Sequence, residues 1–143
     1  MSTSNLLIEL NGTVAWLTIN RPDKLNALNQ ATLSESARAF EQLRNDAKVR
    51  VIVLSGAGKA FCAGADLREM TGPGEESGLP PKGDLAQLLL RFPKLHKPVI
   101  AKVHGVALGG GLGLVASCHF AIAGSSALLG TPEFLKAGDA VVF

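Results

Sequence analysis

Apolar residues along the first half of the chain follow the spacing of two strands, then a helix, then a third strand. Residues 6–10 and 14–19 are β-prone runs separated by Asn11-Gly12, a pair that favours a two-residue hairpin turn. After Asn29, which is suited to an N-cap, apolar side chains recur at helical spacing. Residues 51–54 are apolar throughout, which is typical of a parallel strand buried on both faces. The first half therefore predicts a ββαβ unit.

The second half repeats the order of strand, glycine-rich turn and helix. Apolar residues from Leu85 to Phe92 have helical spacing, and residues 99–103 and 119–123 predict further strands. Between those strands, Gly109-Gly-Gly111 is followed by apolar residues that suit the start of a buried helix. Residues 71–83 are rich in glycine, proline and charge, and predict a flexible loop. The pattern predicts one α/β domain over residues 1–143.

Composition narrows the class of protein. A chain of 143 residues with 47% hydrophobic and 18% charged residues fits a single globular domain. Its 14 lysines and arginines are scattered among 12 acidic residues, so we expect neither a nucleic-acid nor a membrane partner. Cys62 and Cys118 have neither metal-ligand spacing nor the density of a disulfide framework. With no visible secretory signal, these features predict a cytoplasmic or mitochondrial-matrix protein, not a secreted one.

Three familiar motifs are absent or incomplete. Gly56-Ala-Gly-Lys59 lacks the first glycine and the final Ser or Thr of a Walker phosphate loop. Gly111-Leu-Gly113 fits a loose dinucleotide fingerprint, but no carboxylate follows at the end of the next strand. The uncharged run that contains these glycines is shorter than the roughly 18 residues of a membrane span. Nucleoside triphosphate, dinucleotide and membrane roles are therefore disfavoured.

Two glycine turns remain, Ala63-Gly-Ala-Asp66 and Gly109-Gly-Gly111. Each follows a buried strand and opens a predicted helix, where free N–H groups and the positive end of the helix dipole favour negative charge. Two such turns can direct two backbone N–H groups at one carbonyl oxygen, as acyl-transfer and enolate chemistry requires. The turns predict a site for an oxyanion.

His104 and Cys62 stand beside these turns. A single histidine at a strand end is more often structural than catalytic, and we expect no metal site. For Cys62 we expect a small side chain packed behind the first turn.

Five short motifs follow one another between about Leu6 and Glu133. They are Asn20-Arg-Pro22 with Asn26-Ala-Leu28, Phe61-Cys-Ala-Gly-Ala-Asp-Leu67, Lys97-Pro-Val-Ile-Ala101, Gly105-Val-Ala-Leu-Gly-Gly-Gly111 and Thr131-Pro-Glu133. In this order they resemble the signature of the enoyl-CoA hydratase/isomerase (crotonase) superfamily. The resemblance implies a crotonase-like spiral of ββα units (the ClpP/crotonase fold), acyl-CoA thioester substrates and, for a full-length protein, a homotrimer or hexamer. It implies no separate cofactor, because CoA is part of the substrate.

The resemblance also implies roles for particular residues. The N–H groups of Ala65 and Gly110 would form the oxyanion hole, and Glu133 would be the acid/base. The residues expected along the CoA are Lys24, Ala63, Asp66 and Leu67.

The sequence departs from the family pattern at one catalytic position and in its length. Hydratases of this family usually carry a second glutamate at the position of Gly113, whereas an isomerase can move a proton with one acid/base. Hydration of 2-enoyl-CoA is the reaction that the family name implies, and double-bond isomerisation is an alternative. Members are also typically nearly twice as long, so the chain is expected to stop before the C-terminal trimerisation helices. A non-catalytic chain that binds acyl-CoA or oligomerises is a further alternative.

Overall fold

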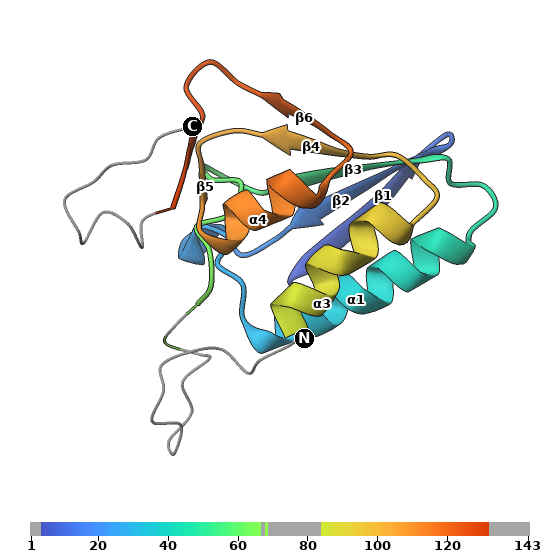
Figure 1. Ribbon diagram of the computed structural model, residues 1–143, viewed down its shortest axis with the longest axis horizontal. Helices are drawn as coiled ribbons and strands as arrows, with labels where there is room; N and C mark the ends of the chain where they lie inside the picture. The colour runs from blue at the N-terminus through green and yellow to red at the C-terminus, as the bar shows by residue number, and fades with distance from the viewer. Residues whose placement is uncertain (1–3, 67, 69–83, 132–143) are drawn as a thin grey trace.

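A five-stranded sheet covered on one face by helices forms the body of the molecule (Figure 1). This computed structural model describes residues 4–66, 68 and 84–131. The strands are β1 (Leu6–Asn11), β2 (Val14–Ile19), β3 (Val51–Gly56), β4 (Val99–Val103), β5 (Val106–Leu108), β6 (Phe120–Ala123) and β7 (Leu128–Gly130). The helices are α1 (Gln30–Asn45), α3 (Asp84–Arg91) and α4 (Gly110–Ser117), with short 3₁₀ turns η1 (Pro22–Lys24) and η2 (Phe92–Lys94).

The large sheet has the strand order β1-β2-β3-β4-β6. β1 and β2 form the predicted antiparallel hairpin, and β2, β3, β4 and β6 run parallel, as expected for buried strands joined by helices. The predicted turn is wrong by one residue. Asn11 pairs with Val14, so Gly12 and Thr13 make the turn, and the φ of 60° at Gly12 suits a residue without a Cβ atom.

Both ends of α1 are held by side chains. The Asn29 carboxamide accepts a hydrogen bond from the Thr32 amide at 2.9 Å, which confirms the predicted N-cap. At the other end, the Lys97 ammonium donates to the carbonyls of Leu43 and Asp46 at 2.6 and 2.7 Å. This cation satisfies carbonyls that the helix end leaves unpaired and offsets the negative end of its dipole.

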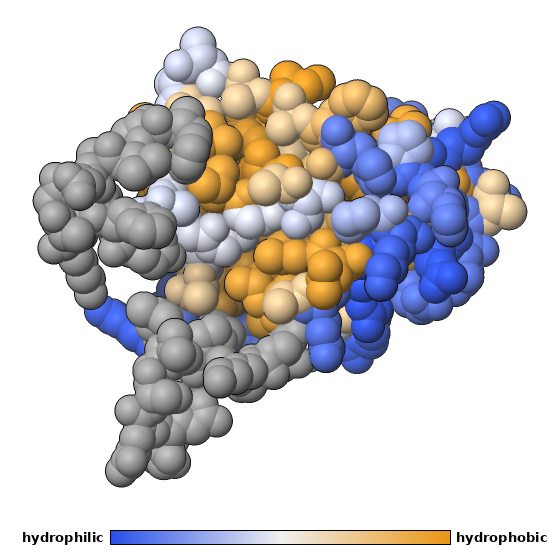
Figure 2. Space-filling model, viewed as in Figure 1, coloured by the Kyte–Doolittle hydropathy of each residue, from blue (hydrophilic) through white to orange (hydrophobic). Residues whose placement is uncertain are grey.

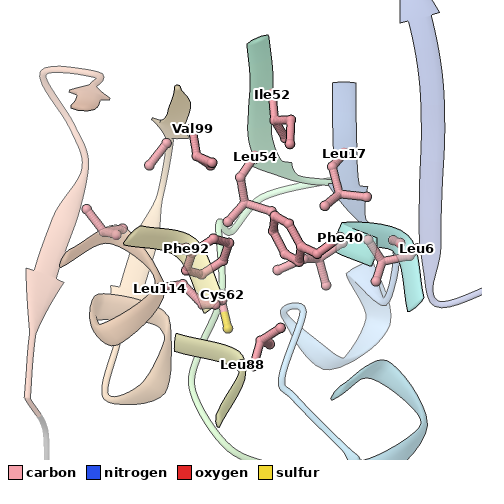
Figure 3. Packing of buried hydrophobic residues seen from close by; sticks show 14 of the residues in the cluster. Leu6, Leu17, Phe40, Ile52, Leu54, Cys62, Leu88, Phe92, Val99 and Leu114 are labelled. Atoms are coloured by element: carbon pink, nitrogen blue, oxygen red, sulfur yellow. The ribbon is translucent and has the colours of Figure 1, made fainter. Parts of the chain in front are cut away.

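The core lies between the sheet and the three helices (Figure 3). Phe40 of α1 and Phe92 of η2 meet edge to face, with ring centroids 4.5 Å apart, under Leu54 of the central strand. Cys62 is fully buried among them, and burial raises the pKa of its thiol to about 11. The thiol therefore stays protonated at neutral pH, in agreement with the predicted packing role.

The opposite face of the sheet carries exposed apolar side chains, among them Phe120 and Ile122 of β6. Trp16 lies on this face, with the ammonium of Lys102 5.8 Å from its ring centroid. Trp16 is only half-buried, because β-strand alternation turns it away from the helices that cover the other face.

A second sheet, β5 paired in parallel with β7, was not predicted. Its two strands of three residues lie beside the start of α4 and complete the surroundings of the glycine turns.

Candidate functional site

Residues 61–66, which carry the first glycine turn, run alongside β5. The Cys62 amide donates to the Val106 carbonyl at 3.1 Å, and the Leu108 amide donates to the Cys62 carbonyl at 3.0 Å. These bonds fix the start of the turn against the strand that leads into Gly109-Gly-Gly111.

Leu28 holds the other side of the same segment. Its amide donates to the Gly64 carbonyl at 2.7 Å, and its carbonyl accepts from the Asp66 amide at 2.8 Å. In a parallel bridge of this kind, the residue between the two bonded neighbours directs its own N–H away from the partner strand. The amide of Ala65 is therefore turned away from Leu28.

The second glycine turn leaves amides free at the start of α4. The N-cap residue Gly109 has a φ of 55°, and its carbonyl accepts the first bond of the helix from Gly113 at 3.0 Å. Amides of the first helical turn, beginning with Gly110, consequently have no partner within the helix. The positive end of the helix dipole adds to their attraction for an oxyanion.

The structure brings these two predicted amides together. A Cβ atom placed on Gly110 would stand 3.8 Å from the amide nitrogen of Ala65. Within the described part of the chain, neither amide donates a hydrogen bond to the protein. Two unpaired donors from separate turns thus lie next to each other.

Two glycines allow the turns to approach so closely. Gly64 has a φ of 105°, and a Cβ atom there would come within 2.9 Å of the Leu108 carbonyl oxygen. A Cβ atom on Gly111 would overlap the Cys62 carbonyl oxygen. Any other residue at either position would push the turns apart.

Asn26 supports the segment that leads into the first glycine turn through hydrogen bonds of its side chain. It is fully buried at a φ of 57°, and its Oδ1 accepts from the Arg21 amide at 2.8 Å. Its Nδ2 donates to the carbonyls of Ala57 and Ala60 at 2.8 and 2.7 Å. The sequence gives no local sign of this role, although asparagine tolerates positive φ better than most residues.

Asp66 forms a buried ion pair with Arg21, at 3.1 Å between Oδ2 and Nη1. The same guanidinium nitrogen donates to the Ala27 carbonyl at 2.6 Å, which ties the segment before α1 to the first turn. The Asp66 carboxylate is therefore committed to holding the turn. Its expected place along the CoA stays a prediction.

The other residues expected along the CoA are only partly described. Lys24 is exposed on η1, and Ala63 is half-buried beside it in space, with its amide donating to the Leu25 carbonyl at 3.0 Å. Leu67, Glu133 and the expected loop at 71–83 lie outside the described residues. The roles of all these residues remain predictions.

Leucines of α3 cover the glycine face of α4. A Cβ atom on Gly110 would stand 3.1 Å from Cδ2 of Leu85, and one on Gly113 would stand 3.2 Å from Cδ1 of Leu89. Figure 2 shows hydrophobic surface over both helices on this side of the molecule. The helical spacing of these leucines predicted a buried face but could not indicate which element it packs against.

Two of the histidines make hydrogen bonds to the backbone. Nε2 of His104 lies 2.8 Å from the Gly58 carbonyl oxygen, and Nδ1 of His119 accepts from the Val99 amide at 3.0 Å. The hydroxyl of Thr131, next to β7, is buried without a hydrogen-bond partner in the described residues.

Within residues 4–66, 68 and 84–131, no group of His, Cys, Asp or Glu could hold a metal ion. No helix in them has the length and hydropathy to cross a membrane.

Comparison with known proteins identifies the family and the fold of this chain. The model of the enoyl-CoA hydratase/isomerase family matches residues 9–138. The chain belongs to this family, and thus to the crotonase superfamily, and its α/β fold is crotonase-like.

Particular relatives include both hydratases and isomerases. The chain is 44% identical to the short-chain-enoyl-CoA hydratase of Clostridium acetobutylicum, over 93% of this chain and 51% of that protein. It is 37% identical to the 1,2-epoxyphenylacetyl-CoA isomerase of Escherichia coli, over 85% of this chain and 48% of that protein. A crystal structure of an enoyl-CoA hydratase/isomerase from Xanthobacter autotrophicus superposes with a TM-score of 0.86 at 35% identity, covering 98% and 53% of the two chains. The chain thus spans about half the length of the relatives it matches.

Proposed function

We propose that this chain binds an enoyl-CoA thioester and stabilises its enolate with the backbone amides of Ala65 and Gly110. The observation that carries the proposal is the meeting of these two unpaired donors from separate turns. Family membership supports an acyl-CoA substrate, because the related enzymes are named for CoA thioesters.

The chemistry follows from where charge develops. A proton removed next to a thioester carbonyl, or water added to a conjugated double bond, leaves negative charge on the carbonyl oxygen. Fixed donors at that oxygen stabilise the transition state more than the ground state, and losing one donor from such a site costs about 3 kcal/mol. Glu133 would carry the proton. Beside an apolar acyl chain, the pKa of its carboxyl group would be raised toward neutral pH.

Two reactions fit this arrangement. Hydration of 2-enoyl-CoA is the reaction for which several relatives are named. Isomerisation of a double bond is the second candidate, favoured by Gly113, because one carboxyl group can serve both proton transfers.

We propose that the active form is a homotrimer or hexamer, to be checked by sedimentation equilibrium.

Turnover of purified chain with 2-enoyl-CoA and 3-enoyl-CoA tests the proposal. Loss of conjugated absorbance with the first thioester indicates hydration, and gain with the second indicates isomerisation. Glu133→Gln should abolish either reaction and leave CoA binding nearly intact, whereas the exposed Glu9→Gln should leave both unchanged. Binding without turnover in the unmodified chain would favour the non-catalytic alternative, and full activity of Glu133→Gln would remove this residue from the mechanism.

A further inference from the structure

Two leucines on one side of α3 pack along two glycines on one side of α4. Leu85 and Leu89 are one helical turn apart, as are Gly110 and Gly113, so each leucine faces one glycine. The first pair lies beside the proposed oxyanion hole, since the bare side of Gly110 also faces the amide of Ala65. The second pair lies one turn further along α4.

Leu89 occupies the space that a side chain at position 113 would need. A Cβ atom on Gly113 would meet both terminal carbons of Leu89, at 3.2 and 3.9 Å; apart from the chain neighbours of Gly113 and the backbone of α4, no other atom of the described residues lies within 4 Å. Contacts at 3.2 Å are tighter than ordinary van der Waals distance, so a longer side chain would require Leu89 to move. The space is therefore filled by one apolar side chain that packs against the core.

We propose that Leu89 is a specificity-determining residue that keeps water out of the space facing Gly113, so that the chain isomerises 3-enoyl-CoA thioesters. The inference rests on the proposed function. Water addition requires a group that holds the water and accepts its proton, and a leucine facing a glycine offers neither. Isomerisation needs no water at all.

The atoms of the isomerisation balance with one carboxyl group. Glu133 as the carboxylate takes a proton from C2 of the 3-enoyl thioester, and the electron pair of that C–H bond passes toward the thioester oxygen, where the two amides stabilise it. The electrons then return to form the C2=C3 double bond, and the pair of the former C3=C4 bond takes the proton from Glu133 at C4. The product is the 2-enoyl thioester, and the carboxylate is regenerated.

A set of variants separates the role of Leu89 from that of the glycine. Gly113→Glu supplies a carboxylate in crowded space, and Gly113→Glu with Leu89→Ala supplies the carboxylate together with room for water. Gly113→Gln with Leu89→Ala controls for charge. Leu90→Ala, on the same helix but 64% exposed, controls for loss of a leucine from α3.

The unmodified chain should convert 3-enoyl-CoA to 2-enoyl-CoA faster than it hydrates 2-enoyl-CoA. The Gly113→Glu, Leu89→Ala variant should hydrate 2-enoyl-CoA at least about tenfold faster than Gly113→Glu alone, a difference in barrier of about 1.4 kcal/mol. Neither the glutamine control nor Leu90→Ala should gain hydration. Equal hydration by the single and double variants, or faster hydration than isomerisation by the unmodified chain, would overturn the inference.

A stability measurement tests the packing of Leu89 against Gly113 independently of enzymatic activity. Gly113→Glu should lower the thermal midpoint of the unmodified chain and lower it less when Leu89 is alanine, because the crowding is then gone. Additive shifts would overturn the packing argument. Absence of turnover in every variant would overturn the proposed function and the reaction class together, while the midpoints would still decide whether Leu89 fills the space.

Discussion

Replacing Asn26 by glycine removes three side-chain hydrogen bonds from a fully buried position. Glycine keeps the φ of 57° without strain, so the backbone conformation can persist while the bonds are lost. The groups that lose a hydrogen bond are the amide of Arg21 and the carbonyls of Ala57 and Ala60. This variant therefore isolates the contribution of the carboxamide.

The size of the effect follows from the number of bonds. At about 1 kcal/mol for each of the three bonds, Asn26→Gly should lower the free energy of unfolding by about 3 kcal/mol. Asn26→Ala should cost about 1 kcal/mol more, because its Cβ atom strains the left-handed conformation. Both losses are large against the 5–15 kcal/mol, roughly, that stabilises an ordinary domain.

Equilibrium unfolding in urea, followed by circular dichroism, measures these differences. Asn45→Ala is the matched control, since the Asn45 side chain is exposed at the end of α1 and its hydrogen-bond partner among the described residues is Glu41, so that its loss should stay within about 0.5 kcal/mol. A loss below about 1 kcal/mol for Asn26→Gly would refute the reasoning, because the three bonds would then contribute no more than one typical bond.

Two further predictions concern the C-terminal end of α1 and the buried thiol. Lys97→Met should lower the free energy of unfolding by about 2 kcal/mol, because two helix carbonyls lose a charged donor, whereas exposed Lys94→Met should have little effect in the same urea titration. Because burial raises the pKa of Cys62 from 9.0 to about 11, its contribution to stability should be constant below pH 9 and fall as the pH rises toward 11. Urea titrations across this range should show a smaller fall for Cys62→Ala, and an identical fall would contradict the assignment.

Periodicity predicted the large sheet and its helices because each element buries one face against many neighbours. The N-cap at Asn29 and the strand predicted over residues 51–54 follow from local chemistry alone, and both are confirmed, the strand as part of β3 (Val51–Gly56). The short strands β5 and β7 could not be predicted, because each has three residues and is stabilised by a partner about 20 residues away.

The site was predictable only in part, for a similar physical reason. Glycine motifs marked Ala65 and Gly110 because close backbone approach requires residues without a Cβ atom, and the structure places them together. Nothing local marks Leu89 as the neighbour of Gly113, since helical spacing identifies a buried face and leaves its partner open. Asn26 was visible as part of a motif, but two of its three side-chain bonds depend on residues more than 30 positions away.

In the proposed site, the amides of Ala65 and Gly110 bind one thioester oxygen. Gly110→Pro removes one donor at the first residue of α4, a position where proline is tolerated, and Gly110→Ala adds similar bulk near Leu85 but keeps the N–H.

The most direct measurement is the infrared carbonyl band of a bound acyl-CoA with an isotope-labelled thioester carbonyl. Binding should lower the carbonyl frequency, Gly110→Pro should reduce this shift, and Gly110→Ala should preserve it. No shift on binding, or the same shift in the proline and alanine variants, would show that these amides do not bind the thioester oxygen.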